Sequence, residues 1–94
     1  MMESIWKEKQ FGNTRCQIIL RSYYDWIEDE YINYFVLKIV NGEEHEFTTF
    51  ITKWKNLVRT FHKKLHHIPK QIRNAILGMY GSFLYQHYRH YAFI

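Results

Sequence analysis

The sequence predicts a small α+β fold, in which a three-stranded antiparallel sheet is covered on one face by two amphipathic helices, in the order β-β-β-α-α. Three observations favour this class. Apolar and polar residues alternate in the first half of the chain, as is typical of strands. The dipeptide Asn41-Gly42 separates two such segments and is the strongest short-range signal for a β-hairpin. After Phe47 the apolar residues recur every three or four positions, which is the spacing of one helix face.

The 94 residues have the length of a single domain, and its first half is predicted to hold the sheet. Residues 1–14 form an N-terminal segment, in which a short helix from Ser4 to Phe11 would end at Gly12. Residues 15–48 form the antiparallel sheet, with strands at about 15–24, 31–40 and 43–48. We interpret residues 25–30 as an acidic loop, and Asn41-Gly42 as a type I′ turn, because both residues tolerate a positive φ.

Two helices are predicted in the second half. Residues 49–67 read as a basic amphipathic helix, with Thr48 or Thr49 as its N-cap. Pro69 would end it, because proline disfavours helical geometry in the residue before it. Residues 69–91 then form an aromatic C-terminal helix. Gly78 and Gly81 lie inside that helix at a cost of about 1 kcal/mol each, which we expect a close backbone contact or a kink to offset.

The charges of the chain are separated along its length. All nine acidic residues lie at or before Glu46, whereas the rest of the chain carries only basic charges. Such an asymmetry indicates an anionic partner for the second half, or pairing with the acidic half within the fold or on a second copy. The residues that we expect to contact a nucleic acid or another anion are Lys53, Lys55, Arg59, Lys63, Lys64, His67, Lys70, Arg73 and Arg89.

Aromatic side chains near the C-terminus are interleaved with basic ones. Stacking of bases on rings, with cations on the phosphates, is the chemistry of proteins that bind single-stranded nucleic acids. Helical spacing assigns about half of these rings to the core and leaves Tyr85 and Tyr88 for an outer face. These two tyrosines are therefore candidates for aromatic contacts to a nucleic acid.

The acidic loop is an alternative contact region. Exposed aromatic residues are enriched at the centres of protein interfaces. Carboxylates in the same loop could imitate the spacing of phosphates, or bind the basic half of a second copy. The residues of this alternative protein contact are Trp26, Glu28, Asp29, Glu30 and Tyr31.

Catalytic and metal-binding patterns are absent from the sequence. No phosphate-binding glycine loop, no His-Glu-x-x-His motif and no nucleophile elbow occurs. The pairs His62/His66 and His87/His90 have helical spacing, but no carboxylate or thiol follows Glu46 to complete a metal site. Cys16 is the single cysteine, which excludes an intrachain disulfide and favours a reducing cytoplasm. We predict no enzymatic activity, no cofactor, no metal, no signal peptide and no membrane partner.

The segment from Ile68 to Leu77, continuing to Tyr85 and Arg89, resembles the final helix of phage head–tail connector proteins. In that family a helix led by proline, with an Ala-Ile-Leu core, ends in a cluster of Tyr and Arg. The resemblance covers roughly a quarter of the chain and implies a phage or mobile-element origin. The leading hypothesis is a small, basic, cytoplasmic, non-enzymatic protein that binds nucleic acid or a nucleoprotein complex. The alternatives are an inhibitor or adaptor that blocks a host protein, and a ring or connector subunit that assembles through its opposite charge poles.

Overall fold

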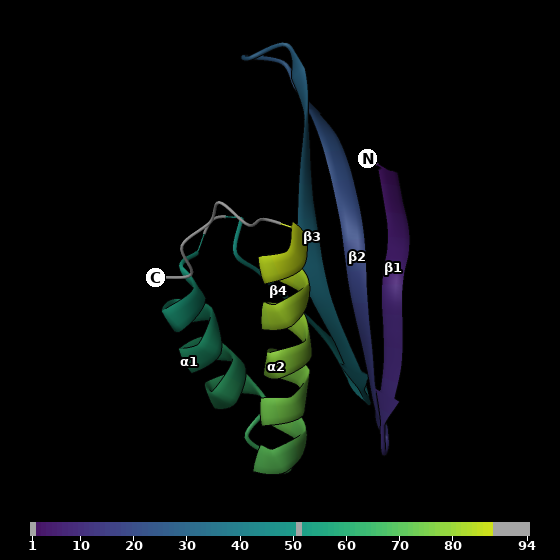
Figure 1. Cartoon of the computed structure of the whole chain (residues 1–94), viewed down its shortest axis with the longest axis vertical. Coiled ribbons are helices and arrows are strands. Elements are labelled where there is room, and N and C mark those ends of the chain that lie inside the picture. Colours follow the sequence, from purple (N-terminus) through teal and green to yellow (C-terminus); the bar gives the residue numbers. More distant parts are fainter. Residues whose placement is uncertain (1, 51, 88–94) are drawn as a thin grey trace. The chain divides into compact units, whose positions relative to one another are not determined.

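The computed structural model describes residues 2–50 and 52–87. The chain divides into two compact units, which are treated one at a time: a sheet unit, Met1–Phe50, and a helical unit, Ile51–Ile94 (Figure 1). The α+β class, the antiparallel sheet and the two helices are as the sequence predicts. The number of strands is not, because the described residues of the sheet unit form four strands instead of three.

The sheet is a meander of β1 (Met2–Phe11), β2 (Thr14–Asp25), β3 (Glu30–Asn41) and β4 (Glu43–Thr48). Its strand order is β1-β2-β3-β4, so every strand pairs antiparallel with its neighbour in the sequence. The predicted β-hairpin at Asn41-Gly42 joins β3 to β4. The type I′ turn is wrong, however, because Gly42 has a φ of 75°, whereas Asn41 is not among the described residues with a positive φ.

β1 occupies the segment for which the sequence predicts a short helix, and it is the strand that the three-stranded prediction lacks. An edge strand needs no apolar face, and this one is exposed along nearly all its length. A bulge at Trp6, between the pairs Ile5–Ile19 and Lys7–Ile18, also breaks the alternation by which a strand is recognised. Gly12, with a φ of 59°, lies in the tight turn between β1 and β2 and not at the end of a helix.

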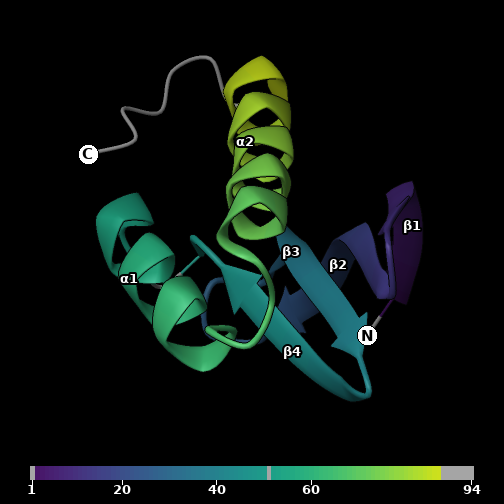
Figure 2. The same cartoon turned by 90° about the horizontal axis from the view of Figure 1, so that it is seen from below.

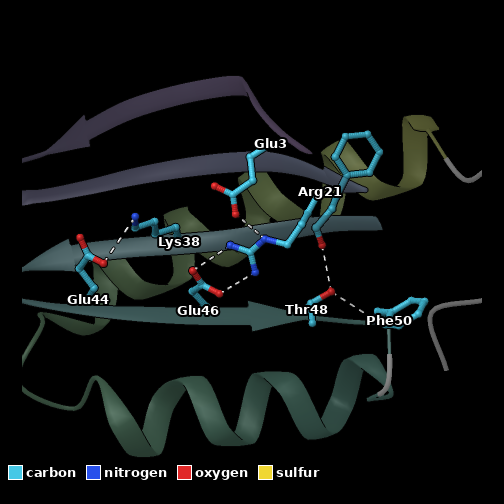
Figure 3. A network of polar contacts seen from close by, with 8 residues as sticks. Glu3, Arg21, Lys38, Glu44, Glu46, Thr48 and Phe50 are labelled. Carbon is cyan, nitrogen blue, oxygen red and sulfur yellow. Dashed lines mark hydrogen bonds and ion pairs between the residues drawn. The ribbon is translucent and has the colours of Figure 1, made fainter. Parts of the chain in front are cut away.

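The two faces of the sheet differ in polarity. Residues paired across antiparallel strands share a face, and one face carries the buried side chains Cys16, Ile18, Leu37, Ile39 and Phe47. The opposite face has a narrow apolar strip at Ile19 and Val36, which are paired and buried. Charged side chains flank this strip and form a network that crosses the strands (Figure 3).

β2 and β3 are longer than the strands beside them. Pairing of β1 with β2 reaches Ser22, and pairing of β4 with β3 reaches Val36. Beyond these points β2 and β3 pair only with each other as far as Asp25 and Glu30, and Figure 1 shows this two-stranded ribbon extending past both neighbours. The predicted loop between two strands is confirmed, although it is shorter than expected, because the ends of the acidic segment belong to the ribbon.

The helical unit contains α1 (Trp54–Lys64) and α2 (Lys70–His87), and Figure 2 shows the short connection between them. α1 is shorter than predicted and α2 begins one residue later than predicted, at Lys70. Residues 88–91 of the predicted second helix lie outside the described residues. The apolar spacing is confirmed by the buried side chains, which are Leu57, Phe61, Leu65, Ile68, Ile76, Leu77, Tyr80, Phe83 and Leu84. The rings of Trp54 and Tyr80, 6.1 Å apart, pack α1 against α2.

The start of α1 differs from the prediction. Its N-cap is Lys53, for which no side-chain capping bond occurs among the described residues. The Thr48 hydroxyl serves the sheet unit instead: it donates to the carbonyl oxygen of Phe35 at 3.0 Å and accepts the amide of Phe50 at 3.1 Å (Figure 3). A strand that ends in a threonine can satisfy that hydroxyl locally, so Thr48 is lost as a helix cap.

The glycines of α2 have different surroundings. A Cβ on Gly81 would lie 3.3 Å from two ring atoms of Trp54, so a side chain and not a backbone approaches there. A Cβ on Gly78 would meet nothing within 4 Å in the described part of the chain. The expected close backbone contact is therefore wrong at both positions. Neither helix formed by the described residues is long and apolar enough to cross a membrane.

Candidate functional site

The α1 basic surface is the first candidate, and we define it as Lys53, Lys55, Arg59, Lys63 and Lys64. All five side chains are exposed. The apolar residues of α1 turn to its buried side, which leaves the cations on the other side. Lys55, Arg59 and Lys63 are four residues apart, which places them about 6 Å apart along the helix axis. His67 and Lys70, also exposed, follow in the connection and at the start of α2.

The helical unit has no acid of its own to balance this surface. The ion pairs found among residues 2–50 and 52–87 all lie in the sheet unit and involve Arg21, Lys38 and His45 as the cations. Neither helix has an acidic residue in its first turn. Basic residues near a helix N-terminus oppose the helix dipole, typically by about 0.3–1 kcal/mol for one charge. Lys53 and Lys70 therefore lie where a bound anion would be stabilised by both the side chains and the helix ends.

Arg73 has a different role from the other predicted contact residues. Its Nε donates to the carbonyl oxygen of Ile68 at 2.9 Å, and its Nη1 lies 2.9 Å from Nδ1 of His62 and 3.4 Å from the carbonyl oxygen of His62. Because a guanidinium only donates, Nδ1 of His62 accepts and the ring is neutral with its proton on Nε2. Desolvation, and then the charges of Arg73 and Lys70, lower the pKa of His62. Arg73 thus ties the two helices together.

Of the residues predicted for the aromatic contact, the structure describes Tyr85. Tyr85 is 63% exposed and, with Trp54, Gly81, Ser82 and Gln86, lines a shallow depression of the helical unit. Tyr88 and Arg89, the other predicted residues of this tract, lie outside the described residues. Tyr85 lies near the C-terminal end of the described part of α2.

The hairpin tip is the second candidate, and we define it as the eight residues from Tyr24 to Tyr31. It contains all residues of the predicted alternative protein contact, Trp26, Glu28, Asp29, Glu30 and Tyr31, and all five are exposed. Trp26 is 87% and Tyr31 is 71% exposed. The sequence prediction missed Ile27, which is 91% exposed, and its position between Trp26 and an acid could have indicated it. The structure therefore gathers aromatic, aliphatic and acidic side chains at one protruding end of the sheet unit.

The acids of β4 are used within the sheet unit. Arg21 binds Glu46 through two nitrogens, at 2.9 and 3.0 Å, and its Nε lies 2.6 Å from Oε1 of Glu3 (Figure 3). The hydrogen bond from Arg21 is the main reason that the pKa of Glu46 is lowered. Lys38 lies 3.5 Å from Glu44. Glu46 thus links β4 to β2 across β3, and Glu44 links β4 to its neighbour β3.

Metal and nucleophile chemistry find little support in the side chains described. No group of three His, Cys, Asp or Glu side chains that could hold a metal ion occurs among these residues. His87 packs against Phe83, with ring centroids 4.3 Å apart. Cys16 is buried, and desolvation raises the pKa of its thiol to about 12, so it is not a thiolate nucleophile near neutral pH.

Comparison of the chain with protein-family models, with curated proteins and with solved structures gave no match. The function must therefore be argued from the two candidate surfaces themselves.

Proposed function

We propose that this protein is a small non-enzymatic binding protein that holds a nucleic acid on the α1 basic surface. The observation that carries the proposal is a row of exposed cations on α1, with no acid and no ion pair among the described residues of the helical unit. Amphipathic helices commonly mix both signs of charge on their polar face. A face with cations alone leaves a positive potential that draws a polyanion.

The spacing of the row agrees with a phosphate backbone. Lys55, Arg59 and Lys63 recur at about 6 Å, close to the separation of successive phosphates along a nucleic-acid strand. If these three cations each bind one phosphate, counterion release predicts a slope of log affinity against log salt of about −2 for a single strand and about −3 for a duplex. Lys53, Lys64 and Lys70 would steepen this slope if they also reach phosphates.

The test is fluorescence anisotropy with labelled single-stranded DNA, duplex DNA and RNA over a salt series. Arg59→Glu/Lys63→Glu should weaken binding by at least about tenfold and flatten the salt slope by about 1.4 for a single strand and about 1.8 for a duplex. The matched control is Lys7→Glu/Arg15→Glu, which makes the same change of charge at exposed positions of the sheet unit. Circular dichroism should show that both variants are folded.

Two results would contradict the proposal. One is unchanged affinity for every probe in Arg59→Glu/Lys63→Glu. The other is an equal loss in both variants, which would show that net charge and not the α1 basic surface determines binding. A preference for single strands that Tyr85→Ala reduces would add base stacking to the role of the helical unit.

The proposed phage or mobile-element origin depends on the resemblance of α2 to the final helix of connector proteins. It is consistent with a small nucleic-acid-binding protein, but the nucleic-acid proposal does not require it.

A further inference from the structure

The hairpin tip is the most exposed group of apolar side chains that the structure describes. Trp26, Ile27 and Tyr31 are each more than two-thirds exposed, and Tyr24 is 42% exposed. Scattered single apolar residues are normal on a protein surface, but several together mark an interaction site. Trp and Tyr are also the residues that most often dominate binding energy. The tip therefore has the composition of a docking element.

The tip is held in shape by its own contacts. Backbone pairing continues to Asp25–Glu30, and the rings of Tyr24 and Tyr31 meet edge to face at 5.2 Å. The Asp25 carboxylate accepts the amides of Ile27 at 3.0 Å and Glu28 at 3.4 Å. Asp29, with a φ of 54°, adopts the left-handed conformation that the turn requires. Such a preorganised loop loses little conformational entropy when it binds.

The charge of the tip selects a basic partner. Asp25, Glu28, Asp29 and Glu30 lie within a stretch from residue 22 to residue 37 that has no Lys or Arg. None of these four acids takes part in an ion pair with another described residue. A complementary surface must offer cations for the carboxylates, and groups that pack on the faces of Trp26 and Tyr31. Lys and Arg side chains do both, through ion pairs and cation–π contacts.

The α1 basic surface of the same protein has this chemistry. It presents exposed Lys and Arg side chains without acidic neighbours, and their aliphatic stems can pack on aromatic rings. We propose that the hairpin tip of one copy docks on the α1 basic surface of a second copy. Because the two surfaces differ, the contact is heterologous and each copy both offers a tip and receives one. Association should therefore close into a ring, of which a reciprocal dimer is the smallest, or continue as an open chain.

The experiment uses the full-length chain and a pair of charge-swapped variants. In the tip variant, Glu28→Lys/Asp29→Asn/Glu30→Lys turns the tip from net negative to net positive, and Asn tolerates the left-handed backbone at that position. In the helix variant, Lys55→Glu/Arg59→Glu/Lys63→Glu makes the α1 basic surface negative. Sedimentation of the wild-type protein, of each variant alone and of their mixture is measured against concentration, at about 50 mM and about 500 mM salt.

The proposal expects four results. The wild-type protein associates in a concentration-dependent way at low salt, and high salt weakens the association by at least about tenfold. Each variant alone stays monomeric, because its tip and its helix have the same sign of charge. The mixture of the two variants associates again, since each positive surface now meets a negative one. Trp26→Ala weakens the wild-type association by about tenfold or more.

Other results would overturn it. A wild-type chain that is monomeric at all concentrations would show that the tip does not dock on a second copy. The tip would then bind a different protein or its own chain. Variants that associate as the wild type does, or a mixture that stays monomeric, would show that these two surfaces do not meet. The tip variant keeps the α1 basic surface and no longer covers it with a docked tip, so it should bind nucleic acid at least as tightly as the wild type. Loss of self-association and loss of nucleic-acid binding are thus measured separately.

Discussion

Replacement of Arg21 by Met should destabilise the sheet, because it breaks the salt bridges that link β2 to β1 and, across β3, to β4. Arg21 lies on β2, and its guanidinium joins Glu3 of β1 to Glu46 of β4, on the other side of β3 (Figure 3). The Arg21 side chain is only 15% exposed, whereas those of Glu3 and Glu46 are 47% and 43% exposed. Met keeps most of the aliphatic packing and removes the charge, so the change isolates the polar contacts.

The expected loss follows from this geometry. Both carboxylates are nearly half exposed and can be solvated again by water when Arg21 is removed, so the large penalty of an unpaired buried charge does not apply. Exposed pairs contribute about 0.2–1 kcal/mol each, and the two-nitrogen contact to Glu46 belongs at the upper end of this range. We expect about 1 kcal/mol from Glu46 and about 0.5 kcal/mol from Glu3. The sum of about 1.5 kcal/mol corresponds to a fall in Tm of roughly 6–12 °C.

The assay is a pair of double-mutant cycles, Arg21→Met with Glu46→Gln and Arg21→Met with Glu3→Gln, followed by thermal and urea unfolding. Coupling to Glu46 should exceed coupling to Glu3, and high salt should reduce both. The pH dependence has a fixed sign. Because folding lowers the pKa of Glu46, mainly through the hydrogen bond from Arg21, its contribution is complete above the ordinary glutamate pKa and disappears as the pH falls through the lowered pKa. An Arg21→Met variant as stable as the wild type, or a stronger coupling to Glu3, would refute this reasoning.

Three other predictions can be checked with the same material. Gly78→Ala should stabilise α2 by about 1 kcal/mol, because the added methyl group meets open space there. Gly81→Ala should stabilise it less, because the added methyl group would lie 3.3 Å from the indole ring of Trp54. A larger gain in stability at Gly81 than at Gly78 in urea unfolding would contradict this. In an NMR titration His62 should have a pKa below the ordinary histidine value, since burial and then the neighbouring positive charges disfavour its protonation, and Arg73→Met should raise that pKa. The stability that neutral His62 contributes is therefore complete above the ordinary histidine pKa and declines as the pH falls below it. Cys16 should react with a thiol reagent only after unfolding, because it is buried and its pKa is raised to about 12, and fast labelling of the native protein would be inconsistent with this structure.

The sequence was sufficient to predict those strands and helices whose side-chain pattern alone determines their structure. The alternation around Ile18 and Leu37 and the Asn41-Gly42 dipeptide predicted β2, β3 and β4, and the spacing of residues such as Leu57 and Phe61 predicted the helices. β1 could not be predicted in this way. It is an edge strand whose own side chains contain little information, and its hydrogen bonds to β2 decide its conformation. The bulge at Trp6 also interrupts the alternation of side chains along β1.

The candidate surfaces also differ in how much of them the sequence could predict. The exposed cations of α1 and the exposed aromatic residues of the hairpin tip follow from charge and composition, which are visible in the sequence. The role of Arg73 does not follow from them. From its charge alone, Arg73 is grouped with the lysines of the predicted anion contact. Its hydrogen bonds to His62 and Ile68 depend on how the connection between the helices folds. A long-range side-chain contact of this kind has no signal in local spacing.

The meander order of the sheet also bears on how the protein is made. Because each strand pairs with the one just before it, every ladder closes between segments that are adjacent in the chain. Local pairing of this kind favours fast folding, and domains emerging from the ribosome generally fold from the N-terminus. The sheet unit, which holds all nine acidic residues, can therefore complete its hydrogen bonds while the basic helices are still being synthesised. A nascent chain would then present a folded, net negative sheet before its positive helices emerge beside ribosomal RNA.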